Sequence, residues 1–119
     1  MFNVNTKNRE ITMSAGDTGE ITFRISGFDF SDVNYRVVFA VKNHGKILKE
    51  EYYQVDDDGR FVVAFENEDT DKLDATVCKY DVTVVVEPVW SGGRIVDGGF
   101  VRTLIPPTRV LVRPAVREI

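Results

Sequence analysis

The sequence predicts an all-β protein, a two-layer antiparallel β-sandwich of about eight or nine strands. Short runs in which apolar and polar residues alternate recur at roughly ten-residue spacing. Turns rich in Gly, Asn and Asp separate these runs. The strongest run, residues 80–86, continues through a Ser-Gly-Gly turn into residues 94–104, so a long central hairpin is expected.

The central strand is expected to be buried on one face. Side chains two apart lie on the same side of a strand, and the inward set is Cys78, Tyr80, Val82, Val84 and Val86. The opposite face carries mostly polar side chains, with Val85 as its apolar exception. One solvated face is typical of antiparallel sheets, so the sheet is predicted to be antiparallel.

Composition fits one folded domain over residues 1–119. Hydrophobic residues make up 43% and charged residues 29% of the chain. The net charge of −4 argues against binding to nucleic acid or to an anionic membrane. The single cysteine permits no internal disulfide, and no apolar run resembles a signal peptide or a membrane span, so we expect a soluble protein made in the cytosol.

Further strands are predicted on both sides of the centre. Alternation is clearest in residues 20–26, where Ile21, Phe23 and Ile25 face inward. The other expected strands are a short edge strand at 2–5, then 9–13, 35–42, 46–54, 60–66 and 110–113. Within the central hairpin, Pro88 is expected to stop the first strand, Gly98 and Gly99 to mark a bulge, and Pro106 and Pro107 to end the return strand.

Residues 46–54 resemble an exposed edge strand and supply most of the predicted interaction surface. Asn43, His44 and Gly45 predict a tight hairpin before them. Charged residues on both faces of this strand are typical of an edge protected against uncontrolled pairing. The predicted interaction surface comprises Lys46, Lys49, Glu51, Tyr53, Trp90 and Phe28.

Acidic residues gather in the middle of the chain. Residues 50–81 hold 11 acidic and three basic side chains, whereas residues 94–119 hold five arginines against Asp97 and Glu118. Such regions could pair between copies or could simply be solvated. Asp56, Asp57 and Asp58 precede a glycine, and Asp69 and Asp71 follow; these five could hold a cation, but they lack calcium-loop spacing and the hairpin-turn interpretation is favoured. Residues 67–73 are predicted to form a short helical crossover between the sheets.

No catalytic or cofactor motif is present. His44 is the single histidine, which excludes a histidine-based catalytic pair built on another position, and the glycine-rich segments lack a phosphate-loop or dinucleotide fingerprint. We therefore predict no enzyme activity, no cofactor and no metal. The sequence does not show the distances between carboxylates, so a catalytic carboxylate pair for glycoside hydrolysis is left as an alternative.

Aromatic residues on loops indicate a binding role or a packing role. Exposed aromatic rings stack on sugars or fill a partner's pocket. The candidates are Trp90, Phe28 and Phe30. The competing interpretation is that all three close the open ends of the sandwich.

The order of motifs resembles that of small immunoglobulin-like domains of tailed bacteriophages. The motifs are the GDTG turn at 16–19, KNHGKI at 42–47, the acidic turn before Phe61, DTD at 69–71, YDVTVVVEP at 80–88 and RIVDGG at 94–99. The nearest such family is that of the phage baseplate upper protein, and the chain resembles its N-terminal domain over nearly the whole length. Longer members continue into a stalk or receptor-binding region, which these 119 residues do not include.

This resemblance implies an immunoglobulin-like fold and a (pro)phage tail or baseplate component. It would be a virion structural protein that docks to other tail or baseplate proteins through strand edges and loops, present in the bacterial cytoplasm during assembly and then in the virion tail. A homo-oligomer is the other partner class. The alternative function is a carbohydrate-binding module in which Trp90 and Tyr52 or Tyr53 stack on sugar rings.

Overall fold

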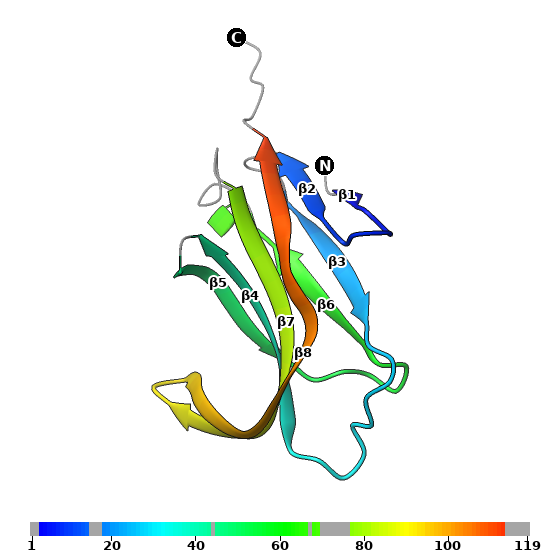
Figure 1. The fold of residues 1–119 in the computed structure, drawn as a ribbon, viewed down its shortest axis with the longest axis vertical. Coiled ribbons are helices and arrows are strands. Elements are labelled where there is room, and N and C mark those ends of the chain that lie inside the picture. The colour runs from blue at the N-terminus through cyan, green and yellow to red at the C-terminus, as the bar shows by residue number, and fades with distance from the viewer. Residues whose placement is uncertain (1–2, 15–17, 44, 67, 70–76, 114–119) are drawn as a thin grey trace.

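The structure is a computed structural model that describes residues 3–14, 18–43, 45–66, 68–69 and 77–113, and within them it is all-β (Figure 1). The strands are β1 (Asn3–Val4), β2 (Ile11–Ser14), β3 (Gly19–Arg24), β4 (Tyr35–Asn43), β5 (Lys46–Tyr53), β6 (Arg60–Phe65), β7 (Val77–Ser91) and β8 (Arg94–Arg113). Six strands form a curled sheet in the order β1-β2-β8-β7-β4-β5, and β3 and β6 form a second, two-stranded sheet.

The two sheets enclose a shared hydrophobic core. Phe23 of β3 lies 5.7 Å from Phe39 of β4 and 6.0 Å from Tyr80 of β7, measured between ring centroids. The alternation predicted for these strands is confirmed, because the inward residues of β3, β4, β6 and β7 are buried, except for the half-buried Val86, while most of their neighbours are not. The core is therefore built largely by period-two patterning.

β7 is the central strand, as predicted. It pairs with β4 on one side and with β8 on the other. The prediction of a purely antiparallel sheet is wrong at one place, because β2 pairs in parallel with the end of β8, from Ile11↔Val110 to Ser14↔Arg113. Parallel neighbours need a long connection, and the chain between β2 and β8 supplies it.

Prolines do not end the strands of the central hairpin. β7 continues through Pro88 to Ser91, and β8 runs through Pro106 and Pro107 to Arg113 as one strand. Among the described residues, β8 has β2 as a second neighbour only at residues 110–113, so Pro106 and Pro107 face no second described strand and a missing N–H breaks no ladder there. The register shift between Tyr80 and Val82 takes up the extra residue there.

The helical crossover predicted for residues 67–73 is not seen. Of that segment only Glu68 and Asp69 are described, and these two have helical backbone geometry but form no separate helical element. The Asp69 N–H donates to the Glu66 carbonyl, and the Asp69 carboxylate accepts the Glu66 N–H. The other residues of the predicted crossover, 67 and 70–73, lie outside the described residues. Asp71 and His44 lie outside the described residues.

The predicted tight turns are present where glycine adopts a positive φ. Gly45 (φ +81°) connects β4 to β5, and Gly92 (φ +60°) and Gly93 (φ +76°) connect β7 to β8. Two consecutive positive φ values match the twist of a two-residue hairpin. The register shows no bulge at Gly98 and Gly99; the nearest one is at Val96 of β8, which is unpaired opposite the step from Val89 to Trp90.

Candidate interaction surface

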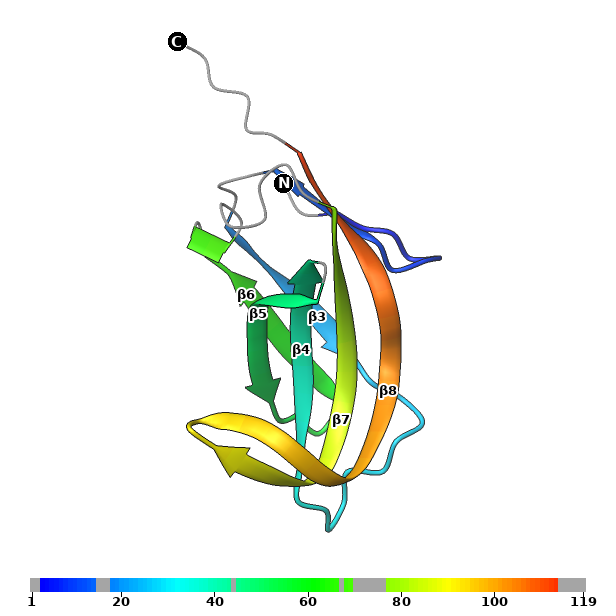
Figure 2. The ribbon, with the colours of Figure 1, turned by 60° about the vertical axis from the view of Figure 1, so that its left-hand side comes forward.

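The distal part of the β7–β8 hairpin extends past the rest of the sheet; we call residues 87–101 the arm. The β4–β7 ladder ends at Tyr35↔Val86, whereas β7 and β8 stay paired to Ser91↔Arg94. The arm curls back toward the side of the sheet where β5 forms the edge (Figures 1 and 2). The distal residues of the hairpin therefore lie outside the core.

Local backbone geometry produces this curl. Glu87 adopts φ +53°, in the left-handed region that side chains other than glycine rarely occupy. Across the hairpin, Gly98 lies so close to the sheet that a Cβ there would be 2.3 Å from Cγ1 of Val85. This contact explains why Val85 is buried although it lies on the outer face of β7. The arm thus covers part of the outer face.

Four side chains hold the arm against β4 and β5; we call Arg36, Glu50, Tyr52 and Arg94 the clasp. Arg94 binds the Glu50 carboxylate through both Nε (2.7 Å) and a terminal nitrogen (3.1 Å). The Tyr52 hydroxyl donates to Glu50 and accepts the Ile95 N–H at 3.2 Å. A two-point guanidinium–carboxylate pair fixes orientation as well as distance.

Trp90 of the arm completes this contact. Its ring meets Tyr52 edge-on, with centroids 5.1 Å apart, and the Arg36 guanidinium lies 5.7 Å from the Trp90 ring centroid. Both contacts are geometries in which aromatic rings attract their neighbours. Arg36 and Tyr52 therefore cover part of the indole.

The contacts of the clasp shift the pKa values of Glu50 and Tyr52. The hydrogen bonds from Arg94 lower the pKa of the Glu50 carboxyl and so favour its ionised form. Burial raises the pKa of the Tyr52 hydroxyl, and its hydrogen bond to Glu50 raises it further. The clasp is thus a charged pair with a neutral phenol beside it at neutral pH.

The arm also carries most of the exposed apolar surface. Among the described residues, five of the eight large hydrophobic side chains that remain exposed lie at positions 89–101: Val89, Trp90, Val96, Phe100 and Val101. Phe100 is 54% and Val101 58% exposed. Because successive residues of a strand point to opposite faces, this hairpin presents apolar side chains on both faces. Contiguous exposed apolar surface is typical of a site that binds another molecule.

The six residues of the predicted interaction surface do not form one patch. Trp90 lies in the arm, and Phe28 lies in the loop after β3, packed 4.7 Å from Phe30 between ring centroids. Lys46 is exposed at the start of β5. β5 is an edge of the sheet among the described residues, as the charge pattern predicted.

Lys49, Glu51 and Tyr53 lie on the inward face of β5 and take part in packing. The Lys49 side chain is 8% exposed, and its Nζ lies 3.2 Å from Asp69 and 5.2 Å from the Phe65 ring centroid. Tyr53 packs 5.2 Å from Phe61 and donates to Glu51, and burial raises the pKa of its hydroxyl. The structure therefore connects Lys49 and Tyr53 to the two-stranded sheet, and Glu51, whose side chain is 43% exposed, binds these two.

The acidic turn before β6 is a tight turn that connects the two sheets; it is not the predicted hairpin turn, because β5 pairs with β4 and β6 pairs with β3. Oδ1 of Asp56 accepts the N–H groups of Asp58 and Arg60, both at 2.9 Å, and the Arg60 N–H lowers the pKa of the Asp56 carboxyl. No group of three or more His, Cys, Asp or Glu side chains among the described residues is arranged to hold a metal ion. Asp69 is engaged with Lys49.

Sequence reasoning missed the clasp and the apolar arm. Glu50 and Tyr52 share the outward face of β5, but no local pattern indicates that residue 94 folds back onto them. The signal available for the arm was the pair Phe100 and Val101, where a strand is apolar at two successive positions beside two glycines. Apolar residues on both parities are unusual for a strand with one solvated face.

Comparisons with family models, with curated proteins and with solved structures found no match to this chain. None of the described segments forms a helix that could cross a membrane.

Proposed function

We propose that this protein is a non-catalytic interaction domain that docks to a protein partner by inserting its β7–β8 arm. The observation that carries the proposal is the exposed apolar side chains on both faces of a hairpin that the clasp holds in one orientation. A hairpin apolar on both faces buries the most surface when it enters a groove. A preorganised element also loses less entropy on binding.

Strand order supports an immunoglobulin-like assignment for the fold. In such domains strands B and E pair in one sheet and strands C, F and G in the other, with C′ added beside C in variable-type domains. Here β3 and β6 take the places of B and E, while β4, β7, β8 and β5 take those of C, F, G and C′. Phe23, Phe39 and Tyr80 fill the centre, where antibody domains have a disulfide and a tryptophan.

The proposed setting is the tail or baseplate of a (pro)phage, and the partner is another tail or baseplate protein. The motif order along the chain supports this setting, and a projecting hairpin suits a component that joins neighbours in an assembly. We propose that the protein is present in the bacterial cytoplasm during assembly and in the virion tail afterwards.

The geometry gives less support to a carbohydrate-binding module. A sugar ring needs a free aromatic face, and Arg36 lies over the Trp90 ring. Trp90 and Tyr52 meet at 82°, so they form no flat platform, and Tyr53 lies on the other face of β5. Glycan binding that Trp90→Ala abolishes would nevertheless replace the present proposal.

The first test is mass spectrometry of density-purified phage particles from the producing bacterium. Peptides of this chain at stoichiometric abundance are expected. Their absence from intact particles would remove the tail from the proposal.

The second test separates the arm from the rest of the surface. The double variant Phe100→Ser/Val101→Ser should fold, but its incorporation into particles should fall at least about tenfold. A tenfold loss corresponds to about 1.4 kcal/mol of binding free energy. Val62→Ser is the matched control, because Val62 is an exposed apolar residue on β6. Equal incorporation of both variants would exclude the arm as the docking element.

A further inference from the structure

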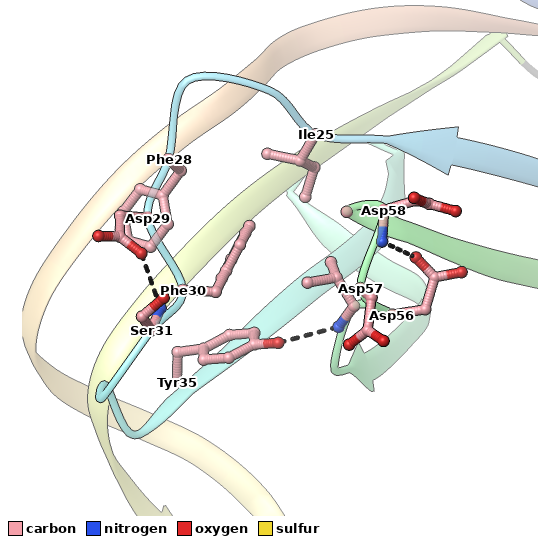
Figure 3. A pocket seen from close by; sticks show the side chains of 11 residues that line it. Ile25, Phe28, Asp29, Phe30, Ser31, Tyr35, Asp56, Asp57 and Asp58 are labelled. Atoms are coloured by element: carbon pink, nitrogen blue, oxygen red, sulfur yellow. Dashed lines mark hydrogen bonds between the residues drawn. The ribbon is translucent and has the colours of Figure 1, made fainter.

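A hollow lies between two segments that have no role in the arm. It is bounded by the loop between β3 and β4 and by the acidic turn between β5 and β6, and its volume is about 480 Å³ (Figure 3). Sites for small groups commonly enclose a few hundred Å³. The hollow is open to solvent, so a side chain projecting from another molecule could enter it.

One wall of the hollow is aromatic. Phe28 and Phe30 lie 4.7 Å apart, and Phe30 lies 4.6 Å from Tyr35, each between ring centroids. Figure 3 shows Phe28 and Phe30 on the loop and Tyr35 at the start of β4, with the Tyr35 hydroxyl directed toward the acidic turn. The Tyr35 hydroxyl accepts the Val55 N–H at 3.0 Å, which ties the aromatic wall to the start of the turn. The wall is therefore a fixed surface.

The other wall is acidic. Asp56, Asp57 and Asp58 line it, and no lysine or arginine is among the lining residues. The Asp56 carboxylate accepts a backbone hydrogen bond within the turn. The Asp58 carboxylate lies 3.9 Å from the Arg60 guanidinium, and both of these side chains are largely exposed. Asp57 forms no ion pair within the described part of the chain, so its charge is available to the hollow.

We propose that this hollow binds the guanidinium group of an arginine side chain that a protein partner presents. A guanidinium is planar and weakly hydrated, so it stacks on aromatic rings while its N–H groups reach carboxylates. An aromatic wall facing an acidic wall provides both contacts at once. A lysine ammonium is strongly hydrated and has no flat face, so it fits this combination less well. The inference rests on the proposed function only in taking the arginine from a protein partner.

The test uses the full-length protein labelled with ¹⁵N and a small peptide, with no partner and no arm variant. N-acetyl-Gly-Arg-Gly-amide should shift the amide signals of the loop and the turn saturably, with affinity in the millimolar range. The same peptide with citrulline, the neutral isostere of arginine, should bind at least about threefold more weakly, as expected for one partly screened charge contact.

Two variants and one control assign the effect to the hollow. Asp57→Asn should weaken arginine peptide binding about threefold, and Phe28→Ala should abolish it. Glu20→Gln removes one acidic charge from an exposed position of β3 and should leave affinity unchanged. If Phe28→Ala fails to fold, Asp57→Asn decides alone.

Equal shifts by the arginine and citrulline peptides, shifts spread over all acidic surfaces, or affinity unchanged in Asp57→Asn would overturn the inference. None of these results bears on the arm, because the peptide test does not involve it. If the arm variant loses particle incorporation but the hollow binds no arginine peptide, the proposed function stands and only the present inference fails.

Discussion

Gly59 lies between the acidic turn and β6, and it contacts Ile25, which follows β3. It adopts φ +78°, and a Cβ there would lie 2.5 Å from the Ile25 carbonyl oxygen. Its own carbonyl accepts the Ile25 N–H at 2.8 Å. Conformation and close packing therefore both require glycine at this position, beside the proposed arginine-binding hollow.

Gly59→Ala should destabilise the protein more than Gly27→Ala, which has the same left-handed conformation (φ +79°) but open space around it. The shared conformational cost is about 1–2 kcal/mol. Displacement of the Ile25 backbone should add about 1 kcal/mol or more in Gly59→Ala by weakening its hydrogen bond. Urea unfolding of both variants measures the difference. Equal losses would mean that the turn moves away without cost.

The β7–β8 arm is the element whose position depends on contacts far apart in the sequence. Arg94 reaches Glu50 across 44 residues, and Ile95 reaches Tyr52 across 43. The positive φ of Glu87 and the close approach of Gly98 to Val85 direct the arm toward these partners. Bend and clasp together keep the apolar side chains of the arm exposed in one arrangement.

Gly98→Ala should move the arm off the sheet, whereas Gly99→Ala should not. A Cβ at residue 98 would lie 2.3 Å from the Val85 side chain, but one at residue 99 would have only ordinary contacts, the nearest at 3.5 Å. Trp90 is the single tryptophan, so its fluorescence reports on the arm. We expect a red shift in Gly98→Ala alone. The same spectrum in both variants would show that Val85 accommodates the methyl group.

Acid should release the clasp. The pKa of Glu50 lies below its ordinary value of 4.5 because Arg94 donates hydrogen bonds to it. The stabilisation that Glu50 gives to the clasp is therefore complete above pH 4.5, and it is lost as the pH falls through the lower pKa of the folded state. Trp90 fluorescence followed from pH 7 downward should therefore change below pH 4.5 while far-ultraviolet circular dichroism keeps its strand signal.

Glu50→Gln should show the altered Trp90 signal already at neutral pH and should lack the acid step. Glu20→Gln, which changes an exposed carboxyl outside the clasp, should keep the step. An acid step that persists in Glu50→Gln would assign it to another group.

In the molecule as a whole, the core and the arm are separate. The described core cluster contains no residue between Val84 and Val110, and Leu104 and Ile105 only pack against it. Core residues come from β2, β3, β4, β6, β7 and the end of β8. The arm can therefore evolve or bind without rebuilding the centre of the fold.

Replacing residues 89–97 by Asn-Gly should leave a folded protein. We expect one cooperative thermal transition, lowered by a few degrees because the outer face loses its cover, as about 1 kcal/mol shifts the midpoint by several degrees in a domain of this size. Differential scanning calorimetry measures this. Loss of the cooperative transition would mean that the arm is part of the folding unit.

The sequence by itself determined the strands and their inward faces, because alternation with period two is a local property of each run. It also located the β4–β5 and β7–β8 turns through glycines that need positive φ. It was misled by Pro106 and Pro107, since whether a missing N–H interrupts a strand depends on whether a neighbouring strand is there to accept it.

Only the tertiary structure decided which charged and aromatic residues meet. Lys49 and Tyr53 look like surface residues of an edge strand, yet the neighbouring two-stranded sheet covers them. Glu50 and Tyr52 look equally exposed, yet the curled arm reaches them. The aromatic loop and the acidic turn, 27 residues apart at Phe30 and Asp57, face each other across the hollow. Such encounters depend on sheet curvature and on backbone bends at single residues, which local patterns do not encode.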